Sequence, residues 1–318
     1  MSGSRRWEPQ LDGLLVLNKP SGPTSTDCLN TLKRRFGQKK IGHAGTLDPL
    51  AAGVLLVLFG QATKMASYLT EEKKTYAGVM VLGLETDSYD IQGRVLEERP
   101  WQDVHEDMVH SEIRAWQDLE DQEVPPVSAA KYKGRPLYAL QRAGLDVPVK
   151  IKRIRIHQAE VIGVDLPRVR FRVTCSQGTY VRSLVHSLGK RLGVGAVLTE
   201  LVREACHPYG LAQARSLDEV LEHDKDALGS LLIPLSEVLP HWKTTRLDQA
   251  QTLAIRQGVR LPADSEGIKA NEPGERRLFH ASDGSPIAMV EAVLQENRTR
   301  WSILRGLWSD EEPAQKTE

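Results

Sequence analysis

The sequence of 318 residues is long enough for about two domains, each able to bury a sizeable core, which excludes the short peptide scaffolds. Its hydrophobic share of 40% and charged share of 26% are typical of a folded, water-soluble protein. The longest apolar run, Ala51 to Gly60, has about half the length of a membrane-spanning helix, so we expect no membrane segment. Arg5 and Arg6 precede no sustained apolar stretch, which argues against a signal peptide and favours a cytoplasmic location.

The formal net charge is zero, with 42 basic and 42 acidic residues, but the charges are segregated along the chain. Residues 97–123 carry ten acidic and two basic side chains, whereas residues 129–157 carry eight basic and one acidic. Residues 33–40 add five cations and no anion. Such cationic segments, with Tyr132 and Tyr138 interleaved, are what a nucleic-acid backbone would attract, although a solvated helix face is the commoner origin of a charge run.

The hydrophobic pattern predicts alternating strands and helices in the main part of the chain. Strands are predicted at residues 14–17, 53–59, 75–82 and 169–175, helices at residues 25–36, 61–69 and 181–192, and a further helix within the acidic stretch. Thr24 or Ser25 is the expected N-cap of the first helix, and Gly37 ends it. Thr179 is the expected N-cap of the last, which places Arg182 in a first turn, beside a helix N-terminus that favours anions.

The chain changes character after about Trp242, where we expect a small, mostly β module of about 65 residues. Residues 247–257 predict a short helix, and residues 278–281, 287–293 and 301–307 predict strands, with a hairpin turn at residues 282–284. The three cysteines, Cys28, Cys175 and Cys206, are far apart and belong to no C-x-x-C motif or histidine cluster. They predict free thiols and no metal site.

Residues 41–49 are neither helical nor alternating, and with the residues that follow they form the most distinctive motif of the chain. Residues 42–53 read Gly-His-Ala-Gly-Thr-Leu-Asp-Pro-Leu-Ala-Ala-Gly. This run resembles the central motif of the TruB family of pseudouridine synthases, G-H-x-G-T-L-D-P-x-A-x-G. Further blocks resemble the same family in the same order, at residues 17–22, 74–76, 86–93, 125–126, 175–182 and 193–196. The similarity extends from about Leu14 to Leu239.

The resemblance implies an α+β fold, the pseudouridine synthase fold, with a mixed, mostly antiparallel central sheet and flanking helices. It implies a catalytic domain at residues 1–240 with an RNA-clamping insertion at about 124–152, and a β-rich, PUA-like RNA-binding domain at residues 241–308. We expect residues 309–318 to form a disordered acidic tail.

The resemblance also implies that the protein isomerises a uridine in RNA to pseudouridine, in the bacterial branch uridine 55 in the T-loop of tRNA. The expected partner is the T-arm of tRNA, bound by a monomer that needs no further protein. The reaction breaks the bond between base and ribose, rotates the base and reattaches it through carbon. Because no atom is gained or lost, no redox cofactor is expected. An ionised carboxylate can stabilise or trap charge at the anomeric carbon, or add to the base.

Three residues match the catalytic positions of the family. Asp48 matches the catalytic aspartate, although an isolated Asp-Pro is usually only a turn. It could attack the ribose, attack the base or remove a proton from the sugar. Arg182 matches the arginine that pairs with this aspartate, where a cation is needed to keep a buried carboxylate charged; outside the motif it would be a surface residue. Tyr76 matches the aromatic that stacks on the flipped base and is close enough for proton transfer, although a strand tyrosine is usually core.

Four further residues match positions that the family uses to bind its substrate. Tyr180 resembles the pocket tyrosine and Leu201 the apolar pocket floor, where plain core packing is the alternative. Lys19 belongs to the support beneath the active-site loop and is expected to be structural or to bind phosphate. His43 is expected to contact RNA by stacking, with titration near pH 6.5 as a general base as the alternative.

The basic residues Lys131, Lys133 and Arg135 correspond to the RNA-clamping insertion of the family. The family usually has P-P-x-Y-S-A-x-K at its start, whereas residues 125–131 are one residue shorter and lack the tyrosine. We therefore expect the local geometry of this contact to differ. The C-terminal module would contact the acceptor stem of tRNA.

Two other hypotheses have different consequences. The chain could be an RNA-binding or tRNA-folding chaperone module in which catalysis is secondary. It could also resemble the guide-RNA-dependent members of the superfamily, which need protein partners, but it has a short tail, no long basic extension and its own clamping insertion.

Overall fold

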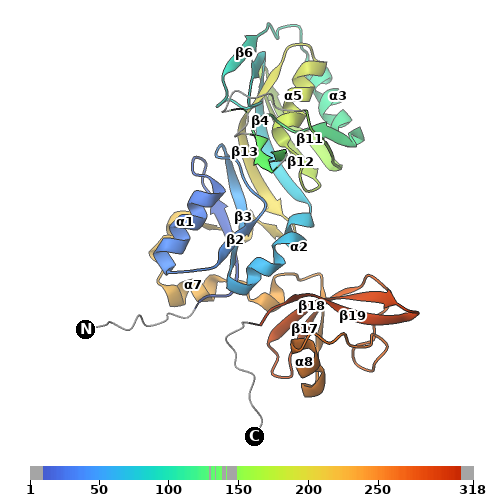
Figure 1. Ribbon diagram of the computed structural model, residues 1–318. Coiled ribbons are helices and arrows are strands. Elements are labelled where there is room, and N and C mark those ends of the chain that lie inside the picture. The colour runs from blue at the N-terminus through green and yellow to red at the C-terminus, as the bar shows by residue number, and fades with distance from the viewer. Residues whose placement is uncertain (1–9, 129, 133, 138–140, 142–148, 309–318) are drawn as a thin grey trace.

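The computed structural model describes residues 10–128, 130–132, 134–137, 141 and 149–308. Helices pack on a mixed nine-stranded sheet, and a separate four-stranded sheet follows at the C-terminal end (Figure 1). The predicted α+β class is therefore confirmed. The acidic tail expected at residues 309–318 lies outside the described residues.

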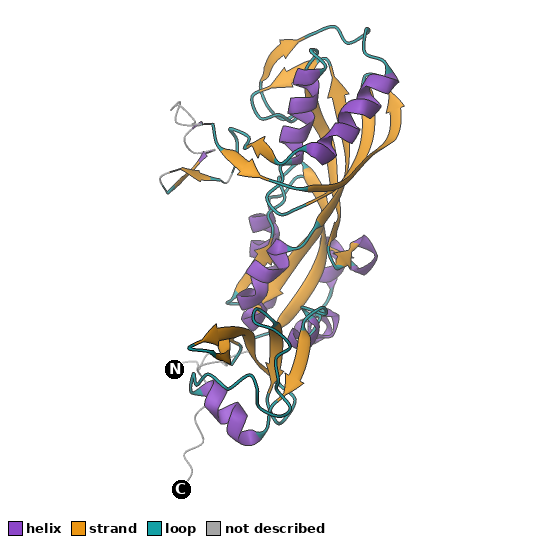
Figure 2. Cartoon of the chain, turned by 90° about the vertical axis from the view of Figure 1, so that its right-hand side faces the viewer, coloured by secondary structure: helices purple, strands orange, loops and turns teal. Residues whose placement is uncertain are grey.

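The nine-stranded sheet is strongly twisted along the long axis of the molecule (Figure 2). Its strands are β1 (Gly13–Lys19), β2 (Ile41–Ala44), β3 (Ala51–Phe59), β4 (Lys74–Leu82), β11 (Ile156–Asp165), β12 (Arg168–Cys175), β13 (Ala196–Cys206), β14 (Tyr209–Gly210) and β15 (Arg215–Ser216). The order is β11-β12-β4-β13-β3-β1-β15, with β2 paired to β3 and β14 to β13. Of the strand pairs in this sheet, β1–β15 and β3–β13 are parallel and the others are antiparallel. The expected mixed, mostly antiparallel sheet is therefore confirmed.

The helices before residue 240 flank this sheet, and α3 and α5 lie together at the end far from the C-terminal sheet (Figure 1). The helices are α1 (Ser25–Phe36), α2 (Ala66–Glu71), α3 (Glu106–Ala115), α5 (Val181–Arg191), α6 (Leu217–Glu222), α7 (Lys225–Leu231) and α8 (Gln249–Arg256), with short 3-10 helices η1 (Gly60–Met65), η2 (Trp116–Asp118), η3 (Leu211–Gln213) and η4 (Leu235–Glu237). Among the described residues no helix is long and apolar enough to span a bilayer.

Two helix starts show how local sequence sets the ends of these elements. Thr24 caps α1 through a capping box with Asp27, and Gly37 ends the helix in the left-handed conformation at φ 61°. The predicted cap of α5 is wrong by one residue. Tyr180 is the N-cap, and the Thr179 hydroxyl instead donates to the Ser176 carbonyl 3.0 Å away.

Most predicted strands are confirmed, but long-range pairing adds several that were not predicted, among them β2, β11 and β13. The predicted loop at residues 41–49 begins as β2, because its first four residues pair with the buried strand β3. Strand β13 escaped prediction because charged residues such as Glu200 and Glu204 interrupt its apolar alternation. Its pairing with β4 determines its conformation, as tertiary context often overrides strand propensity. The helix predicted at residues 61–69 is divided between η1 and α2.

Three further pairs of short strands lie outside the two larger sheets. They are β5 (Leu84–Thr86) with β6 (Val95–Glu98), β7 (Asp121–Glu123) with β10 (Ile151–Arg153), and β8 (Lys131–Tyr132) with β9 (Arg135–Pro136).

The C-terminal sheet consists of β16 (Lys243–Arg246), β17 (Arg276–His280), β18 (Pro286–Gln295) and β19 (Arg298–Gly306), with α8 beside it (Figure 1). Phe279 and Trp301 lie at the centre of its own apolar cluster. A second apolar cluster joins this sheet to the nine-stranded sheet. In it, Trp242 packs edge-on against Tyr68 with ring centroids 5.0 Å apart. The predicted strands and hairpin of this region are confirmed.

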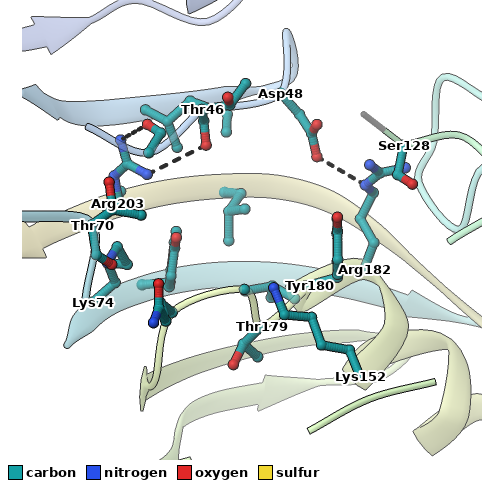
Figure 3. Close-up of a pocket in the computed structure, with 18 residues that line it drawn as sticks. Thr46, Asp48, Thr70, Lys74, Ser128, Lys152, Thr179, Tyr180, Arg182 and Arg203 are labelled. Carbon is teal, nitrogen blue, oxygen red and sulfur yellow. Dashed lines mark hydrogen bonds and ion pairs between the residues drawn. The ribbon is translucent and has the colours of Figure 1, made fainter. Parts of the chain in front are cut away.

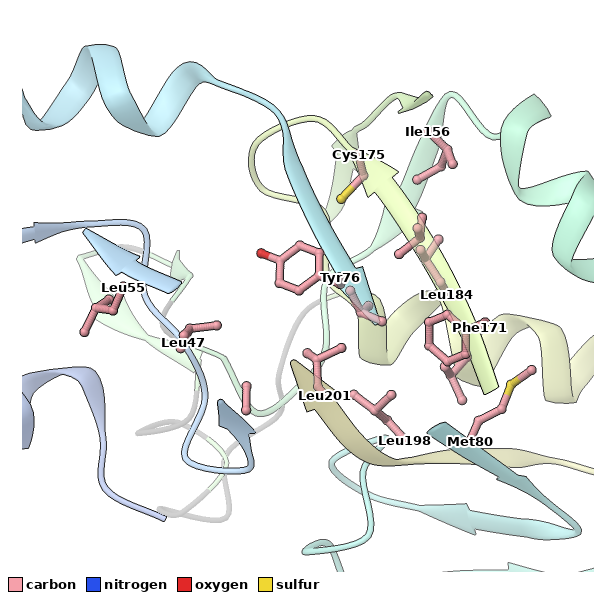
Figure 4. Packing of buried hydrophobic residues seen from close by; sticks show 14 of the residues in the cluster. Leu47, Leu55, Tyr76, Met80, Ile156, Phe171, Cys175, Leu184, Leu198 and Leu201 are labelled. Carbon is pink, nitrogen blue, oxygen red and sulfur yellow. The ribbon is translucent and has the colours of Figure 1, made fainter. Parts of the chain in front are cut away.

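The largest apolar cluster lies between the nine-stranded sheet and helices α1, α3 and α5. Phe171 packs edge-on against Trp116 and lies directly over Gly78, where a Cβ would approach its ring to 2.5 Å. Tyr76 lies at the margin of this cluster, and its hydroxyl points away from Phe171 and Cys175 (Figure 4). The core therefore ends in a polar group at this margin.

Strands β3 and β13 meet through only three residue pairs, and this junction places the loop before β3 beside β13. Gly53 pairs with Arg203 at φ 100°, and a Cβ at Gly53 would lie 2.3 Å from the Arg203 carbonyl oxygen. A residue with a side chain would be strained in both backbone and packing here. Glycine is thus required for the two strands to approach.

We expect Gly53→Ala to lower the free energy of unfolding by at least about 2 kcal/mol, because it combines backbone strain with a backbone clash. Gly258→Ala is the matched control: Gly258 has φ 80° but nothing within 4 Å of its added Cβ, so only the strain remains, about 1 kcal/mol. Urea denaturation of both variants measures the difference. Equal losses would contradict the close approach at Gly53.

Candidate active site

A cavity of about 270 Å³ opens at the junction of β3 and β13 (Figure 3). Its walls come from segments far apart in the sequence: the loop between β2 and β3, the start of β4, the middle of β13, and residues 177–182, which lead into α5. Five residues predicted from the sequence line it, namely Asp48, Tyr76, Tyr180, Arg182 and Leu201.

Asp48 and Arg182 form an ion pair in the cavity wall, with Arg182 Nε 2.9 Å from Asp48 Oδ2 (Figure 3). The two side chains differ in burial: 44% of the Asp48 side chain is exposed, against 5% of Arg182. The guanidinium therefore approaches the carboxylate from the protein side and leaves it open to the cavity. This is the arrangement expected for a carboxylate that acts on a bound ligand.

Arg182 is held by more than Asp48. Its Nη1 donates to the Ser88 carbonyl at 2.8 Å and its Nη2 to the Val127 carbonyl at 3.1 Å. The buried carboxylate of Asp90 lies 3.6 Å from Nη1. Because several acceptors surround the planar guanidinium, its orientation toward Asp48 is fixed.

Asp90 is fixed in turn by its own turn of chain. Its Oδ1 accepts hydrogen bonds from the Ser88 hydroxyl at 2.7 Å and from the Gln92 amide at 3.0 Å. Tyr89, between them, adopts the left-handed conformation at φ 67° and stacks on His186 with ring centroids 3.7 Å apart. This segment belongs to the family-like block at residues 86–93, but none of its residues was predicted to belong to the site.

The loop that carries Asp48 is tied to the start of α1. The Ser25 hydroxyl donates to the Leu47 carbonyl at 3.0 Å and accepts from the Leu47 amide at 2.9 Å. The Gly22 amide donates to the Pro49 carbonyl at 2.8 Å. These contacts clamp the loop on both sides of the carboxylate.

Lys19 is completely buried behind this loop. Its Nζ donates to the Pro20 and Pro23 carbonyls at 2.8 and 2.7 Å, and burial lowers the pKa of the ammonium. It thereby holds the segment that meets Pro49. Two roles were expected for Lys19, a structural one and the binding of phosphate. Its burial and its hydrogen bonds to backbone carbonyls favour the structural role.

The two tyrosines and Leu201 supply the apolar part of the cavity. Tyr76 is 8% exposed, and burial raises the pKa of its phenol to about 12, even though Arg203 lies close enough to oppose the shift. Burial also raises the pKa of Tyr180. Both phenols are therefore neutral near pH 7, which allows their hydroxyls to donate hydrogen bonds.

The remaining predicted residues lie outside the cavity lining. His43 is on β2, partly buried, and burial and then the nearby Arg203 lower its pKa. Its Nδ1 has no hydrogen-bond partner among the described residues. Lys131 and Arg135 lie in the hairpin of β8 and β9, three residues or more beyond the cavity-lining Ser128, and Lys133 lies outside the described residues.

The segment that lacks the family tyrosine still contributes to the site. Val127 supplies a carbonyl to Arg182, and Ser128 lines the cavity. The shortened sequence at residues 125–131 therefore contacts the ion pair through its backbone.

Two buried cationic residues of the cavity were not predicted from the sequence. Arg203 is 1% exposed and Lys74 is 5% exposed, and both line the cavity. Side chains two residues apart on a strand lie on the same face of the sheet. Lys74 is therefore expected on the face of Tyr76, and Arg203 on the face of Leu201. This periodicity was the signal in the sequence that could have identified both residues.

The described residues hold no group of three or more histidine, cysteine or acidic side chains arranged for a metal ion.

Comparison with known proteins identifies relatives along almost the whole chain. The model of the TruB family pseudouridylate synthase (N terminal domain) matches residues 33–181. A protein named tRNA pseudouridine synthase B from Nitratidesulfovibrio vulgaris is 50% identical over 304 residues, which cover 94% of this chain and 99% of the relative. A protein of the same name from Geobacter sulfurreducens is 35% identical over 306 residues, covering 95% and 96%.

Solved structures agree on the fold. A Cbf5-Nop10-Gar1 complex contains a chain with a TM-score of 0.71 at 22% identity, covering 96% of this chain and 91% of that one. An archaeal box H/ACA sRNP Nop10-Cbf5 complex contains a chain with a TM-score of 0.69 at 21% identity, covering 95% and 88%. Because sequence relatives are this similar over nearly the full length, the chain belongs to the TruB family of pseudouridylate synthases.

Proposed function

We propose that this isomerase converts uridine to pseudouridine in tRNA, at position 55 of the T-loop, with Asp48 as its catalytic carboxylate. The observation that carries the proposal is the half-exposed Asp48, held by a buried Arg182 in the wall of the cavity. The name shared by the relatives, tRNA pseudouridine synthase B, supports tRNA as the substrate.

The chemistry needs a negative charge beside the ribose. When the bond between C1′ and N1 breaks, positive charge develops at the anomeric carbon, and the Asp48 carboxylate either bonds to that carbon or removes a proton from the sugar. The released base turns, C5 bonds to C1′, and the proton lost from C5 is balanced by one gained at N1. Arg182 is assigned the task of holding Asp48 in a single orientation throughout.

The apolar part of the cavity is suited to an extruded base. Flipping a nucleotide costs a few kcal/mol, and stacking on an aromatic ring returns about 1–3 kcal/mol. Tyr76 and Tyr180 present rings to the cavity and Leu201 an aliphatic surface. We assign the stacking to Tyr76.

The rest of the chain is proposed to hold the RNA. The segment at about residues 124–152, with Lys131, Lys133 and Arg135, acts as an RNA clamp, and His43 contacts the T-loop. Residues 241–308 form a PUA-like domain that contacts the acceptor stem, while residues 1–240 form the catalytic domain. The protein acts as a monomer in the cytoplasm, where its substrate is found.

Asp48→Asn tests the catalytic assignment. It removes the negative charge but keeps the shape, so we expect pseudouridine formation to fall by at least about a thousandfold. Binding of tRNA should stay within about twofold, because phosphate contacts dominate affinity. Tritium release from labelled uridine at position 55 and filter binding measure the two quantities. Undiminished turnover would refute the assignment.

The same variant separates catalysis from RNA folding. In a strain that lacks its own synthase, Asp48→Asn should leave position 55 unmodified. Growth fitness equal to that of the wild type, despite unmodified tRNA, would favour the chaperone hypothesis.

The pKa of Tyr76, about 12, predicts the pH dependence of a second variant. Because the phenol is neutral in the folded protein from roughly pH 6 to 10, its titration cannot shape the rate profile in that range. We expect Tyr76→Phe to lower the single-turnover rate by about tenfold or more through loss of one hydroxyl hydrogen bond, by the same factor at every pH. A factor that shrinks as the pH falls from 9 to 6 would indicate an ionised tyrosinate instead.

A further inference from the structure

Arg203 and Lys74 are two cations buried in the cavity, where backbone oxygens accept their hydrogen bonds and the Tyr76 phenol is a further partner of Arg203. Arg203 Nε donates to the Val54 carbonyl at 2.7 Å, and Nη2 to the Gly45 carbonyl at 3.0 Å. Lys74 Nζ donates to the Thr70 and Glu72 carbonyls at 2.5 and 2.6 Å. Within the described residues, no carboxylate lies within 4.0 Å of either charged group.

The two cations are neighbours. A Cβ added to Gly45 would lie 3.4 Å from Arg203 Nη1 and 3.7 Å from Lys74 Cε, so both reach the same point of the cavity wall. Figure 3 shows them at one side of the cavity, with Asp48 and Arg182 at the other. The cavity therefore has a carboxylate at one end and, at the other, two cations that form no ion pair with a described carboxylate.

Such a pair is costly to bury. Moving an ammonium or guanidinium from water into protein costs several kcal/mol unless an opposite charge compensates it, and two like charges repel. Burial, and to a lesser extent Arg203, lower the pKa of Lys74 accordingly. A negative charge placed in the cavity would relieve both penalties.

We propose that Arg203 and Lys74 form an anion site that binds the carbonyl oxygens of the detached uracil ring. The inference rests on the proposed function. When the C1′–N1 bond breaks, its electron pair stays with the base and spreads onto the ring oxygens, while Asp48 faces the carbon left electron-deficient. The charge leaves the base again when C5 bonds to C1′, and the proton then lost from C5 balances the one gained at N1, so no other reactant is required.

The position of the pair favours the base over an RNA phosphate as the source of the negative charge. Arg203 and Lys74 are at least 95% buried, beside the apolar side chains of Tyr76 and Leu201. The exposed Lys152 also lines the cavity and is placed to meet a phosphate. A phosphate contact would raise affinity for RNA, whereas stabilisation of the departing base would raise the rate.

The first test compares Lys74→Met with Lys74→Arg, which keeps the charge, and with Lys190→Met, a control at the exposed end of α5. We expect Lys74→Met to lower the single-turnover rate at saturating tRNA by about a hundredfold, with the dissociation constant changed by less than about twofold. Lys74→Arg should recover at least about tenfold of that loss, and Lys190→Met should match the wild type. Arg203→Lys should retain more activity than Arg203→Met.

Two results would overturn the proposal. Lys74→Met could retain the wild-type rate, or it could weaken tRNA binding while the rate at saturation stays unchanged, which would assign the site to phosphate. If the wild type forms no pseudouridine in tRNA, the proposed function itself fails.

A second measurement uses the wild type and does not depend on a stable variant or on turnover. Barbiturate is a pyrimidine that is an anion at neutral pH, whereas uracil is neutral. Because hydrogen bonds to charged groups are the stronger kind, we expect barbiturate to bind at least about tenfold more tightly than uracil by isothermal titration. Equal affinities would overturn the anion site.

Discussion

The ion pair between Asp48 and Arg182 is the interaction on which the rest of the site depends. Its partners are 134 positions apart in the sequence, and each is fixed by a different part of the fold. Ser25 and Gly22 clamp the loop of Asp48, while Ser88, Asp90 and Val127 surround the guanidinium. Because the arginine is buried and the aspartate half exposed, the pair presents a charged carboxylate to the cavity in one orientation. A surface ion pair, with both side chains free to move, would not achieve this.

The cavity exists because the nine-stranded sheet is nearly divided between β3 and β13. These strands share three residue pairs and then diverge, which leaves room between the halves of the sheet for a ligand. Gly53 allows the strands to meet, and Arg203 ties β13 to the carbonyls of Gly45 and Val54. The same arginine thus supports the loop that carries Asp48 and supplies charge to the opposite wall.

An isomerase leaves the composition of its substrate unchanged, and in the proposed mechanism the charge that separates lies within one substrate. The cavity is built in a way that suits this task, with Asp48 at one end, Arg203 and Lys74 at the other, and neutral aromatic and aliphatic surfaces between them. Electrostatic groups arranged in advance of reaction need no reorganisation when charge develops, which is why they are effective in partly buried sites.

Much of this protein could be predicted from its sequence. The apolar runs of β1, β3, β4 and β12, the capping box of α1 and the hairpin before β18 are local signals, and the motif around Asp48 identified the family. Strand β13 could not be predicted, because its charged residues mask its pattern until β4 and β3 pair with it. The burial of Arg203 and Lys74, the second carboxylate behind Arg182 and the neutral state of Tyr76 were likewise decided by tertiary structure. Burial and charge proximity depend on residues distant in the chain, and only the folded sheet brings those together.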